Sequence, residues 1–403
     1  MSKVVLAYSG GLDTSYCVAY LKEAGYEVHA ATVNTGSFSQ EELADIEKRA
    51  FELGVSSFTV LEKTKSFYDN CIKYLVFGNV LKNHVYPLSV SAERMFQALA
   101  IANYARQTGA EAIAHGSTGA GNDQVRFDLA FHILVPQVKI ITPIRDQKLS
   151  REEEVKFLQE RGVDISWEKA QYSINKGLWG TSVGGKETLN SWDHLPEDAY
   201  PSQLVKQDEK ILEILFEKGQ LVAVDGQRFD HAVAAIEHLN DLATPYAVGR
   251  DIHVGDTIIG IKGRVGFEAA APLIMIKAHQ LLEKHTLSKW QMHLKDQLAN
   301  WYGMLLHEGQ FLEPVMRNIE GFLDHSQETV NGKVKIRLTP YRFEVLGVDS
   351  SADLMSNKFG TYGEMNRAWS GEDVKGFTKI LANSPNIYYS VNDSLLQNFL
   401  EQL

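Results

Sequence analysis

The stretch from Val4 to Ser15 constrains the fold more than any other part of the chain. Its sequence, VVLAYSGGLDTS, indicates a short buried strand, a tight glycine turn and the first turn of a helix. Gly10 and Gly11 remove two β-carbons where the backbone must turn, and the free N–H groups of a helix start favour an anion. We therefore predict a phosphate-binding loop. It is not a Walker A loop, because no Gly-Lys-Ser/Thr follows, and it is not the dinucleotide fingerprint, because the Gly-x-Gly-x-x-Gly spacing is absent.

Strand and helix signals alternate from residue 1 to about 165. Four further strands are expected, at 28–33, 58–61, 112–114 and 138–141. Ser39 with Glu42 and Ser150 with Glu153 form capping-box patterns that open two of the helices. This alternation predicts an α/β domain with a doubly wound parallel sheet, in which ligands bind beyond the carboxyl ends of the strands.

The pattern changes after residue 165. Residues 172–195 are rich in Gly, Ser, Thr and Asn, which indicates a long functional loop. Hairpin turns are expected at 225–226 and 330–333, and short strands between 254 and 267. Between 288 and 307, apolar residues at helical spacing predict a packing stripe formed by Trp290, Leu294, Leu298, Trp301 and Leu305.

We therefore predict an α/β nucleotide-binding domain over 1–165, a mixed α+β domain over 166–372 and a C-terminal tail over 373–403. The tail ends in a short amphipathic segment that cannot bury its apolar face alone. Docking on a partner subunit and packing on its own domain both stay open.

Composition excludes some classes of protein. The net charge of −11 weighs against a nucleic-acid partner. An apolar run of membrane-spanning length and a signal peptide are not found in the sequence, so we expect no membrane partner and a cytoplasmic location. Cys17 and Cys71 are expected to be reduced, buried thiols rather than a disulfide or metal ligands.

A second glycine-rich loop, HGSTGAGNDQVRF at 115–127, follows the strand expected at 112–114. It should therefore lie on the same sheet edge as the first loop. Such a loop could hold an amino acid, with Asp123 for an ammonium group and Arg126 or Thr118 for a carboxylate. The alternative is a solvated loop whose Asn and Asp residues hold turns.

The SGGLDTS segment resembles the signature of ATP-pyrophosphatases, which cleave ATP between its α and β phosphates and adenylate a substrate oxygen. More closely, the chain resembles the argininosuccinate synthase family. The segments that carry this resemblance are AYSGGLDTS at 7–15, HGSTGAGNDQVR at 115–126, Tyr86 with Ser91, the surroundings of Trp179, and VGRD at 248–251. The resemblance implies that ATP and citrulline form citrullyl-AMP and pyrophosphate, and that the amine of aspartate then displaces AMP to give argininosuccinate.

Matching the family's motifs residue by residue assigns a site. The resemblance implies that ATP is bound by Ala7, Tyr8, Ser9, Gly10, Gly11, Leu12, Asp13, Thr14, Ser15, Val33 and Gly116. Aspartate would be bound by Thr118, Asn122 and Asp123, and citrulline by Tyr86, Ser91, Arg94, Asn122, Arg126, Ser173 and Ser182. Ser9, Asp13, Asp123 and Arg126 are expected to act in catalysis. Mg²⁺ is expected with ATP, without a metal ligand assigned among the side chains, and a homotetramer is implied.

The chain departs from the family pattern at two positions. Family members carry Val-Glu-Asn-Arg after Gly-Arg-x-Asp and a tyrosine further on, and that glutamate and tyrosine contact citrulline. Here Gly255 stands for the glutamate and Phe267 for the tyrosine. Either Asp256 or another acid substitutes, or the substrate lacks a free α-ammonium, as an Nα-acylated citrulline would. A tRNA-modifying ATP-pyrophosphatase and a non-catalytic nucleotide sensor are further alternatives.

Overall fold

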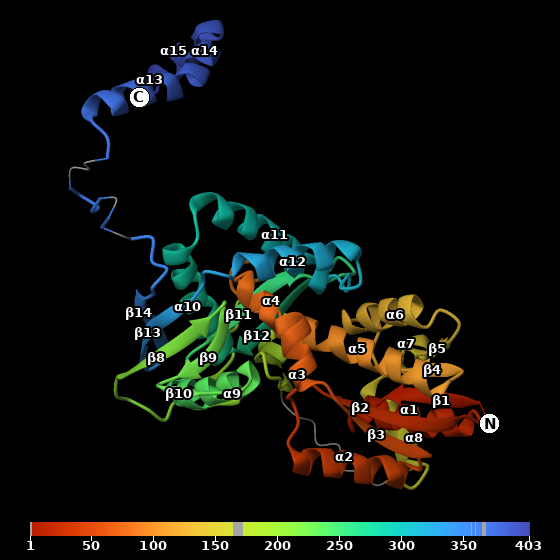
Figure 1. The fold of residues 1–403 in the computed structure, drawn as a ribbon. Helices are drawn as coiled ribbons and strands as arrows, with labels where there is room; N and C mark the ends of the chain where they lie inside the picture. The colour runs from red at the N-terminus through yellow and green to blue at the C-terminus, as the bar shows by residue number, and fades with distance from the viewer. Residues whose placement is uncertain (1, 164–171, 356, 359, 365–367) are drawn as a thin grey trace. The chain divides into compact units, whose positions relative to one another are not determined.

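The computed structural model describes residues 2–163, 172–355, 357–358, 360–364 and 368–403 (Figure 1). The chain forms two compact units, residues 1–352 and residues 353–403. The domain boundary predicted between residues 165 and 166 lies outside the described residues. The division into three domains therefore stays a prediction.

A parallel sheet of five strands forms the first part of the chain. Its strands are β1 (Lys3–Ala7), β2 (Glu27–Asn34), β3 (Ser57–Glu62), β4 (Ala112–Ala114) and β5 (Lys139–Ile141). Their order is β3-β2-β1-β4-β5, and every neighbouring pair is parallel. The predicted doubly wound α/β fold is thus confirmed. The direction of winding reverses between β1 and β4, and ligands of such sheets bind at this switch point.

Helices cover both faces of this sheet. The larger ones are α1 (Leu12–Glu23), α2 (Gln40–Leu53), α5 (Ser89–Thr108), α6 (Asp123–Leu134) and α8 (Arg151–Gln159). Shorter ones are α3 (Thr64–Phe67), a π-helical turn (Tyr68–Ile72), α4 (Lys73–Phe77) and α7 (Pro143–Gln147). Alternate β1 residues enter different cores, because Val4 and Leu6 pack with α1 and α2, whereas Val5 packs with α5. Both predicted capping boxes are formed, at the starts of α2 and α8.

The two cysteines are buried in these cores. Cys17 lies in the core that includes α1, and Cys71 lies in the core that includes α5. Both are free thiols, as predicted.

An antiparallel sheet of order β10-β9-β8-β13-β14 lies further along the chain. Its strands are β8 (Lys210–Glu217), β9 (Gln220–Val224), β10 (Gln227–Arg228), β13 (Gly332–Thr339) and β14 (Arg342–Asp349). The hairpin turn at Asp225 and Gly226 is confirmed, with φ of 51° and 82°. The hairpin predicted at 330–333 is wrong. Strand β13 begins there after a helix, and the turn to β14 comes at residues 340–341.

A second antiparallel sheet has the order β11-β12-β7-β6. Its strands are β6 (Ser173–Asn175), β7 (Thr181–Gly184), β11 (Arg250–Asp256) and β12 (Lys262–Glu268). The strands expected between 254 and 267 are confirmed. The single long loop expected over 172–195 is wrong, because β6 and β7 lie within it. These short polar strands are held by main-chain pairing, of β7 to β12 and of β6 to β7, which side-chain patterns do not report.

Four longer helices belong to this part of the chain, α9 (Ala232–Ala243), α10 (Ala270–Thr286), α11 (Lys289–His307) and α12 (Pro314–Ser326), with 3₁₀ turns at Lys186–Leu189, Glu197–Ala199 and Thr244–Tyr246. The stripe predicted on α11 packs only in part, because Trp290 and Trp301 are 72% and 56% exposed. The helix instead buries Lys295, Ala299, Tyr302 and Leu306, so its packed face is offset by one position from the predicted stripe.

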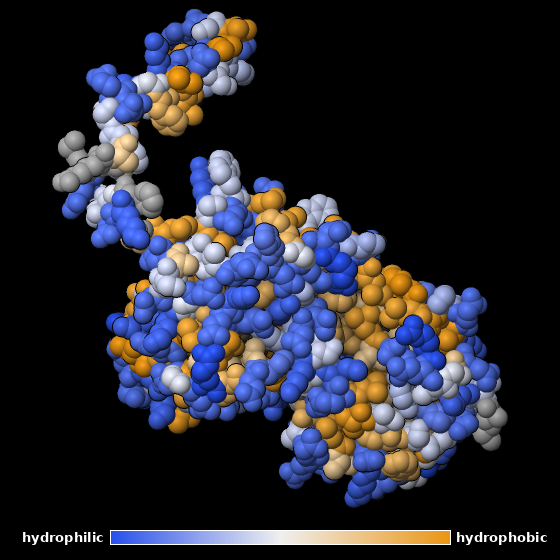
Figure 2. Space-filling model, in the orientation of Figure 1, coloured by the Kyte–Doolittle hydropathy of each residue, from blue (hydrophilic) through white to orange (hydrophobic). Residues whose placement is uncertain are grey.

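The second unit contains α13 (Gly371–Leu381), α14 (Asn383–Val391) and α15 (Asp393–Leu400). Within the described residues, these helices bury none of their side chains. Figure 2 shows apolar and polar residues side by side on their surface. Separately, the helices of the described residues include none long and apolar enough to cross a membrane.

Candidate active site

The first glycine loop joins β1 to α1 as predicted. Gly10 has φ of 74°, and a Cβ there would lie 2.9 Å from Ile46 Cγ1, so both the conformation and the space require glycine. Thr14 Oγ1 lies 3.4 Å from Ser9 N, which donates to it, and 3.3 Å from Ser9 Oγ. Gly11 precedes the first turn of α1 with an extended backbone. The result is a fixed turn ahead of a helix start, which suits a phosphate.

The second glycine loop joins β4 to α6 and touches the first. A Cβ on Gly116 would lie 3.2 Å from the carbonyl carbon of Asp13, so the two backbones approach closely there. Buried His115 anchors the loop, since its Nε2 lies 3.0 Å from Asp128 Oδ1 and its Nδ1 accepts from Ser117 N at 3.2 Å. Both loops therefore share one sheet edge, as predicted, at the switch point between β1 and β4.

A cavity of about 790 Å³ opens between these loops, the end of β2, the start of α5 and the β6 segment. Many residues assigned from the sequence line it: Ala7, Tyr8, Ser9, Gly11, Leu12, Asp13, Thr14, Val33, Arg94, Gly116, Thr118, Asp123 and Ser173. Lining residues that the sequence assignment missed include Thr32, Ser37, Phe38, Glu93, Gln97, Ser117, Arg151, Asn175 and Lys176. The other assigned residues do not line it: Gly10, Ser15, Tyr86, Ser91, Asn122, Arg126 and Ser182.

Arg94 organises the end of the cavity away from the phosphate loop. Its guanidinium donates to Glu93 Oε2 at 3.2 Å, Gln97 Oε1 at 3.0 Å, Asp123 Oδ2 at 3.3 Å and Asn175 Oδ1 at 2.8 Å. Burial alone would lower the pKa of Arg94, but the two carboxylates beside it raise that pKa above its usual value. Arg94 was assigned by its match to the family's motif, whereas Glu93, next to it in a largely apolar helical stretch, was missed.

Arg126 is buried, and its guanidinium bonds within the chain. It donates to Asp123 Oδ1 at 3.0 Å, to Ser91 Oγ at 2.9 Å and to the carbonyl oxygen of His307 at 2.9 and 3.2 Å. Burial lowers the pKa of Arg126, against the opposing effect of Asp123. Arg126 therefore connects α6 with α5 and the end of α11. Its contact with a substrate stays a prediction.

Tyr86 is also buried, with its ring stacked on His253 at 4.9 Å and tilted against Phe267 at 5.3 Å. Its hydroxyl lies 3.0 Å from Ser89 Oγ and accepts from Val90 N at 3.1 Å. Burial raises the pKa of Tyr86. A Cβ on Gly255 would lie 2.6 Å from His253 Nε2, so the imidazole fills the space that a side chain at position 255 would take.

Two assigned polar residues bond to neighbouring segments. Asn122 Oδ1 accepts from Ile258 N at 2.8 Å, which ties the second glycine loop to the β11–β12 connection. Ser182 Oγ accepts from Asn175 Nδ2 at 3.3 Å, which places Ser182 behind the Arg94 cluster.

A buried carboxyl group lies next to the phosphate loop. Glu154 on α8 is 3% exposed, and its Oε2 is without a hydrogen-bond partner among the described residues. Burial and the adjacent carboxylate of Asp13 raise the pKa of Glu154 to about 8. From the sequence, residues 152–154 indicate only an acidic first helical turn, and the structure separates Glu154 from its two exposed neighbours.

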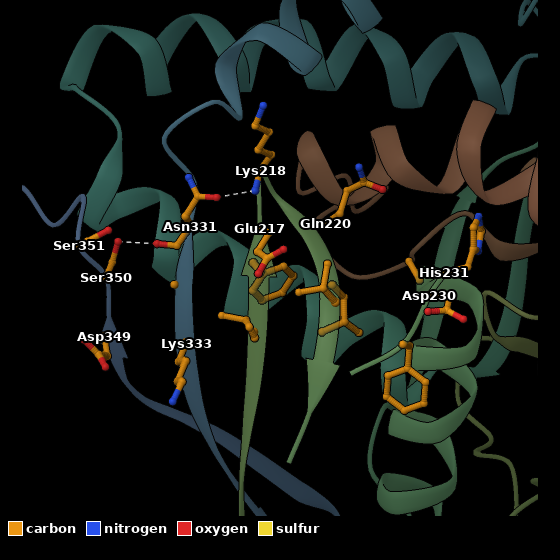
Figure 3. A pocket seen from close by; sticks show the side chains of 17 residues that line it. Glu217, Lys218, Gln220, Asp230, His231, Asn331, Lys333, Asp349, Ser350 and Ser351 are labelled. Atoms are coloured by element: carbon orange, nitrogen blue, oxygen red, sulfur yellow. Dashed lines mark hydrogen bonds between the residues drawn. The ribbon is translucent and has the colours of Figure 1, made fainter. Parts of the chain in front are cut away.

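A second cavity, of about 880 Å³, lies among β8, β9, β13 and the start of α9 (Figure 3). Lys218 N donates to Asn331 Oδ1 at 2.7 Å at one side of it. The glycine loops do not contribute to its described lining. Within the described part of the chain, groups of three or more His, Cys, Asp or Glu side chains able to hold a metal ion are not found.

A parallel sheet with two touching glycine loops at its switch point defines an α/β nucleotide-binding protein. Residues 3–164 match the family model described as the Arginosuccinate synthase N-terminal HUP domain, and residues 172–388 match that of the C-terminal domain. The chain therefore belongs to the argininosuccinate synthase family, and it is an ATP-dependent carbon–nitrogen ligase of that type.

Three relatives named argininosuccinate synthase illustrate the similarity. The chain is 37% identical to that of Dictyoglomus turgidum over 388 residues, which covers 96% of this chain and 97% of the relative. It is 38% identical to that of Xylella fastidiosa over 400 residues, covering 97% and 98%. It is 36% identical to that of Methanocaldococcus jannaschii over 364 residues, covering 89% and 91%. The family and the ligase class indicated by the sequence are thus confirmed.

Proposed function

We propose that this protein condenses citrulline with aspartate to argininosuccinate, through citrullyl-AMP, with release of AMP and pyrophosphate. The observation that carries the proposal is the single cavity that joins the touching glycine loops to the Arg94 cluster. A nucleotide phosphate suits one end, and the charged groups of amino acids suit the other. Because both ends belong to one cavity, an oxygen of a substrate bound at the amino-acid end can reach the α-phosphate of a nucleotide bound at the other end.

The chemistry depends on positioning and on charge. A ureido oxygen is a weak nucleophile, so holding it against the α-phosphate is the main contribution required of the protein. Main-chain N–H groups at the start of α1 would stabilise the charge that develops on pyrophosphate. ATP enters as its Mg²⁺ complex, and Asp13, on the cavity wall beside the phosphate loop, provides the oxygen ligand type that Mg²⁺ prefers.

We assign aspartate to Thr118, Asn122 and Asp123, and citrulline to Tyr86, Ser91, Arg94, Asn122, Arg126, Ser173 and Ser182. Support comes from Thr118, Asp123, Arg94 and Ser173, which line the cavity. Arg126 supports the assignment indirectly, because it holds Asp123 and Ser91 in place.

A labelled substrate tests the proposed reaction. We expect Mg-ATP, aspartate and citrulline carrying ¹⁸O in its ureido group to give AMP and pyrophosphate, with the ¹⁸O in AMP, as measured by mass spectrometry. Transfer of the label requires that the ureido oxygen attacked the α-phosphate. Formation of ADP, or unlabelled AMP, would contradict the proposal. Nucleotide binding without turnover on any citrulline derivative would favour the nucleotide sensor instead.

A second candidate is the same reaction on an Nα-acylated citrulline. The observation that favours it is the wall beside Tyr86, where Phe267 is wholly buried and His253 excludes a side chain at position 255. Asp256 is a poor substitute acid, since it is largely exposed and paired with Lys262 at 2.6 Å. Comparing kcat/KM for citrulline with that for its Nα-acetyl and Nα-succinyl forms decides the matter. A strong preference for free citrulline would rule this candidate out.

We also propose a homotetramer located in the cytoplasm. Exposed apolar side chains on α13–α15, such as Phe377 and Ile380 at 63% and 77%, support association through the second unit. The full chain of 45.1 kDa should then sediment at about four times that mass. Replacing Phe377 and Ile380 by Glu should dissociate the assembly, and an unchanged mass would contradict this role.

A further inference from the structure

Glu93 is a buried carboxylate that lines the cavity near the start of α5, and it is 4% exposed. Its two oxygens accept hydrogen bonds from opposite sides. Oε1 accepts from Thr35 Oγ1 at 2.8 Å and from the hydroxyl of Ser37. Oε2 accepts from Arg94 at 3.2 Å. One side chain thus connects two groups that differ in position and in chemistry.

On the Oε1 side, Thr35 and Ser37 belong to the segment that leaves the carboxyl end of β2. Ser37 and its neighbour Phe38 line the cavity next to Val33, on the side where we place the nucleotide. The segment is closely packed, because a Cβ on Gly36 would lie 3.0 Å from Leu178 Cβ. The hydrogen bonds from the Thr35 and Ser37 hydroxyls to Glu93 therefore fix the position of this segment, which forms part of the cavity wall.

On the Oε2 side, Arg94 holds Asp123 and Asn175 at the amino-acid end of the cavity. Glu93 and Asp123 are the two carboxylates that pair with this guanidinium. A shift of Glu93 therefore moves Arg94 as well as the wall after β2. Since the group is buried, water does not readily replace either set of bonds.

We propose that Glu93 is a positioning residue that couples the nucleotide end of the cavity to the amino-acid end. The inference rests on the proposed function for the identity of the two ligands. A nucleotide that orders the segment after β2 also orders Arg94 through Glu93, and an amino acid on Arg94 does the reverse. Such coupling is reciprocal, so each ligand tightens the binding of the other by the same factor.

Glu93→Met tests the link because it keeps a side chain of similar length and removes both carboxylate oxygens. An amide would be no test, because its NH₂ group could donate to the hydroxyl oxygens while its own oxygen accepts from Arg94. The second variant, Thr35→Val with Ser37→Ala, removes only the hydroxyl side and leaves the pair with Arg94 intact. As a matched control, Glu320→Gln alters another buried carboxylate, which pairs with Arg317 on α12 and does not line the cavity.

Calorimetry measures the coupling without turnover. The Kd of α,β-methylene-ATP is determined with and without saturating citrulline. We expect citrulline to tighten this Kd at least about 5-fold in the wild type and in Glu320→Gln, and to leave it nearly unchanged in both other variants. In the double variant, the KM for citrulline should change less than the KM for ATP.

A ratio of the two Kd values near one in the wild type, or the wild-type ratio retained in Glu93→Met, would overturn the proposal. If Glu93→Met fails to fold, the double variant decides by the same ratio. Failure of the proposed reaction is a separate outcome. It would show as a lack of AMP formation by the wild type, whereas the ratio of Kd values requires only that the ligands bind.

Discussion

The two ends of the cavity are formed by different kinds of contact. At the phosphate end, the decisive contacts are between backbones, with Gly10 in a conformation that glycine favours and Gly116 against Asp13. At the amino-acid end, charged side chains from α5 and α6 and an amide from β6 bond to one another around Arg94. The first end depends on shape, and the second depends on balanced charge. Substitutions should therefore disturb the two ends in different ways.

Adding bulk at the phosphate end should have the largest effect. In Gly116→Val, the new side chain would have to push the second loop away from the backbone of Asp13, since a Cβ alone would lie 3.2 Å from it. We expect kcat/KM to fall by roughly 1,000-fold, or about 4 kcal/mol of transition-state stabilisation, because the phosphates would be misplaced. Steady-state assay of AMP formation measures this.

Gly121→Ala is the matched control in the same loop. A Cβ on Gly121 would meet none of the described atoms within 4 Å, so activity should stay within about threefold of wild type. If kcat/KM of Gly116→Val stayed within tenfold of the wild-type value, close contact between the two backbones would not be what shapes this end of the cavity.

At the amino-acid end, charge pairing should matter more than space. Arg126→Lys keeps the positive charge but cannot reach Asp123, Ser91 and the His307 carbonyl together. Buried partners would be left without bonds, so we expect the free energy of unfolding to fall by about 3 kcal/mol. Urea titration at fixed protein concentration measures it.

An exposed arginine serves as the control for this second substitution. Arg228 pairs with Glu217 in two bonds of 2.9 and 3.0 Å at the surface. Arg228→Lys should cost less than about 1 kcal/mol, because exposed pairs contribute little. Equal losses in the two variants would show that burial does not distinguish Arg126.

The same contrast explains what could be predicted from sequence. The phosphate end is local, since β1, its glycines and the start of α1 follow one another within residues 3–14. The second loop could be placed because it follows a strand of the same parallel sheet. Ser39 and Ser150 identified their helix starts because a capping box spans only four residues.

The amino-acid end was only partly predictable, because its contacts join distant segments. Glu93 bonds to Thr35, 58 residues earlier, and Arg94 bonds to Asn175, 81 residues later. Neither pairing leaves a periodic pattern in the sequence. Likewise, β7 is defined by main-chain pairing to a strand some 80 residues away and β6 by pairing to β7, so their polar residues resembled a loop.

Glu154 adds a titratable group to the phosphate end, and the prediction made from it has the smallest expected effect. Its pKa is about 8 in the folded chain, against 4.5 ordinarily. The folded state then holds a proton that the unfolded state releases, so stability should fall as pH rises from about 5 to about 8.

Glu154→Gln cannot lose a proton and should remove this slope. Between pH 5 and pH 6.5, the variant should gain about 2 kcal/mol relative to wild type, measured by urea titration. Glu152→Gln, at an exposed position on the same helix, should keep the wild-type slope. Parallel curves for Glu154→Gln and wild type would mean that Glu154 is ionised beside Asp13, and that this end of the cavity also balances full charges.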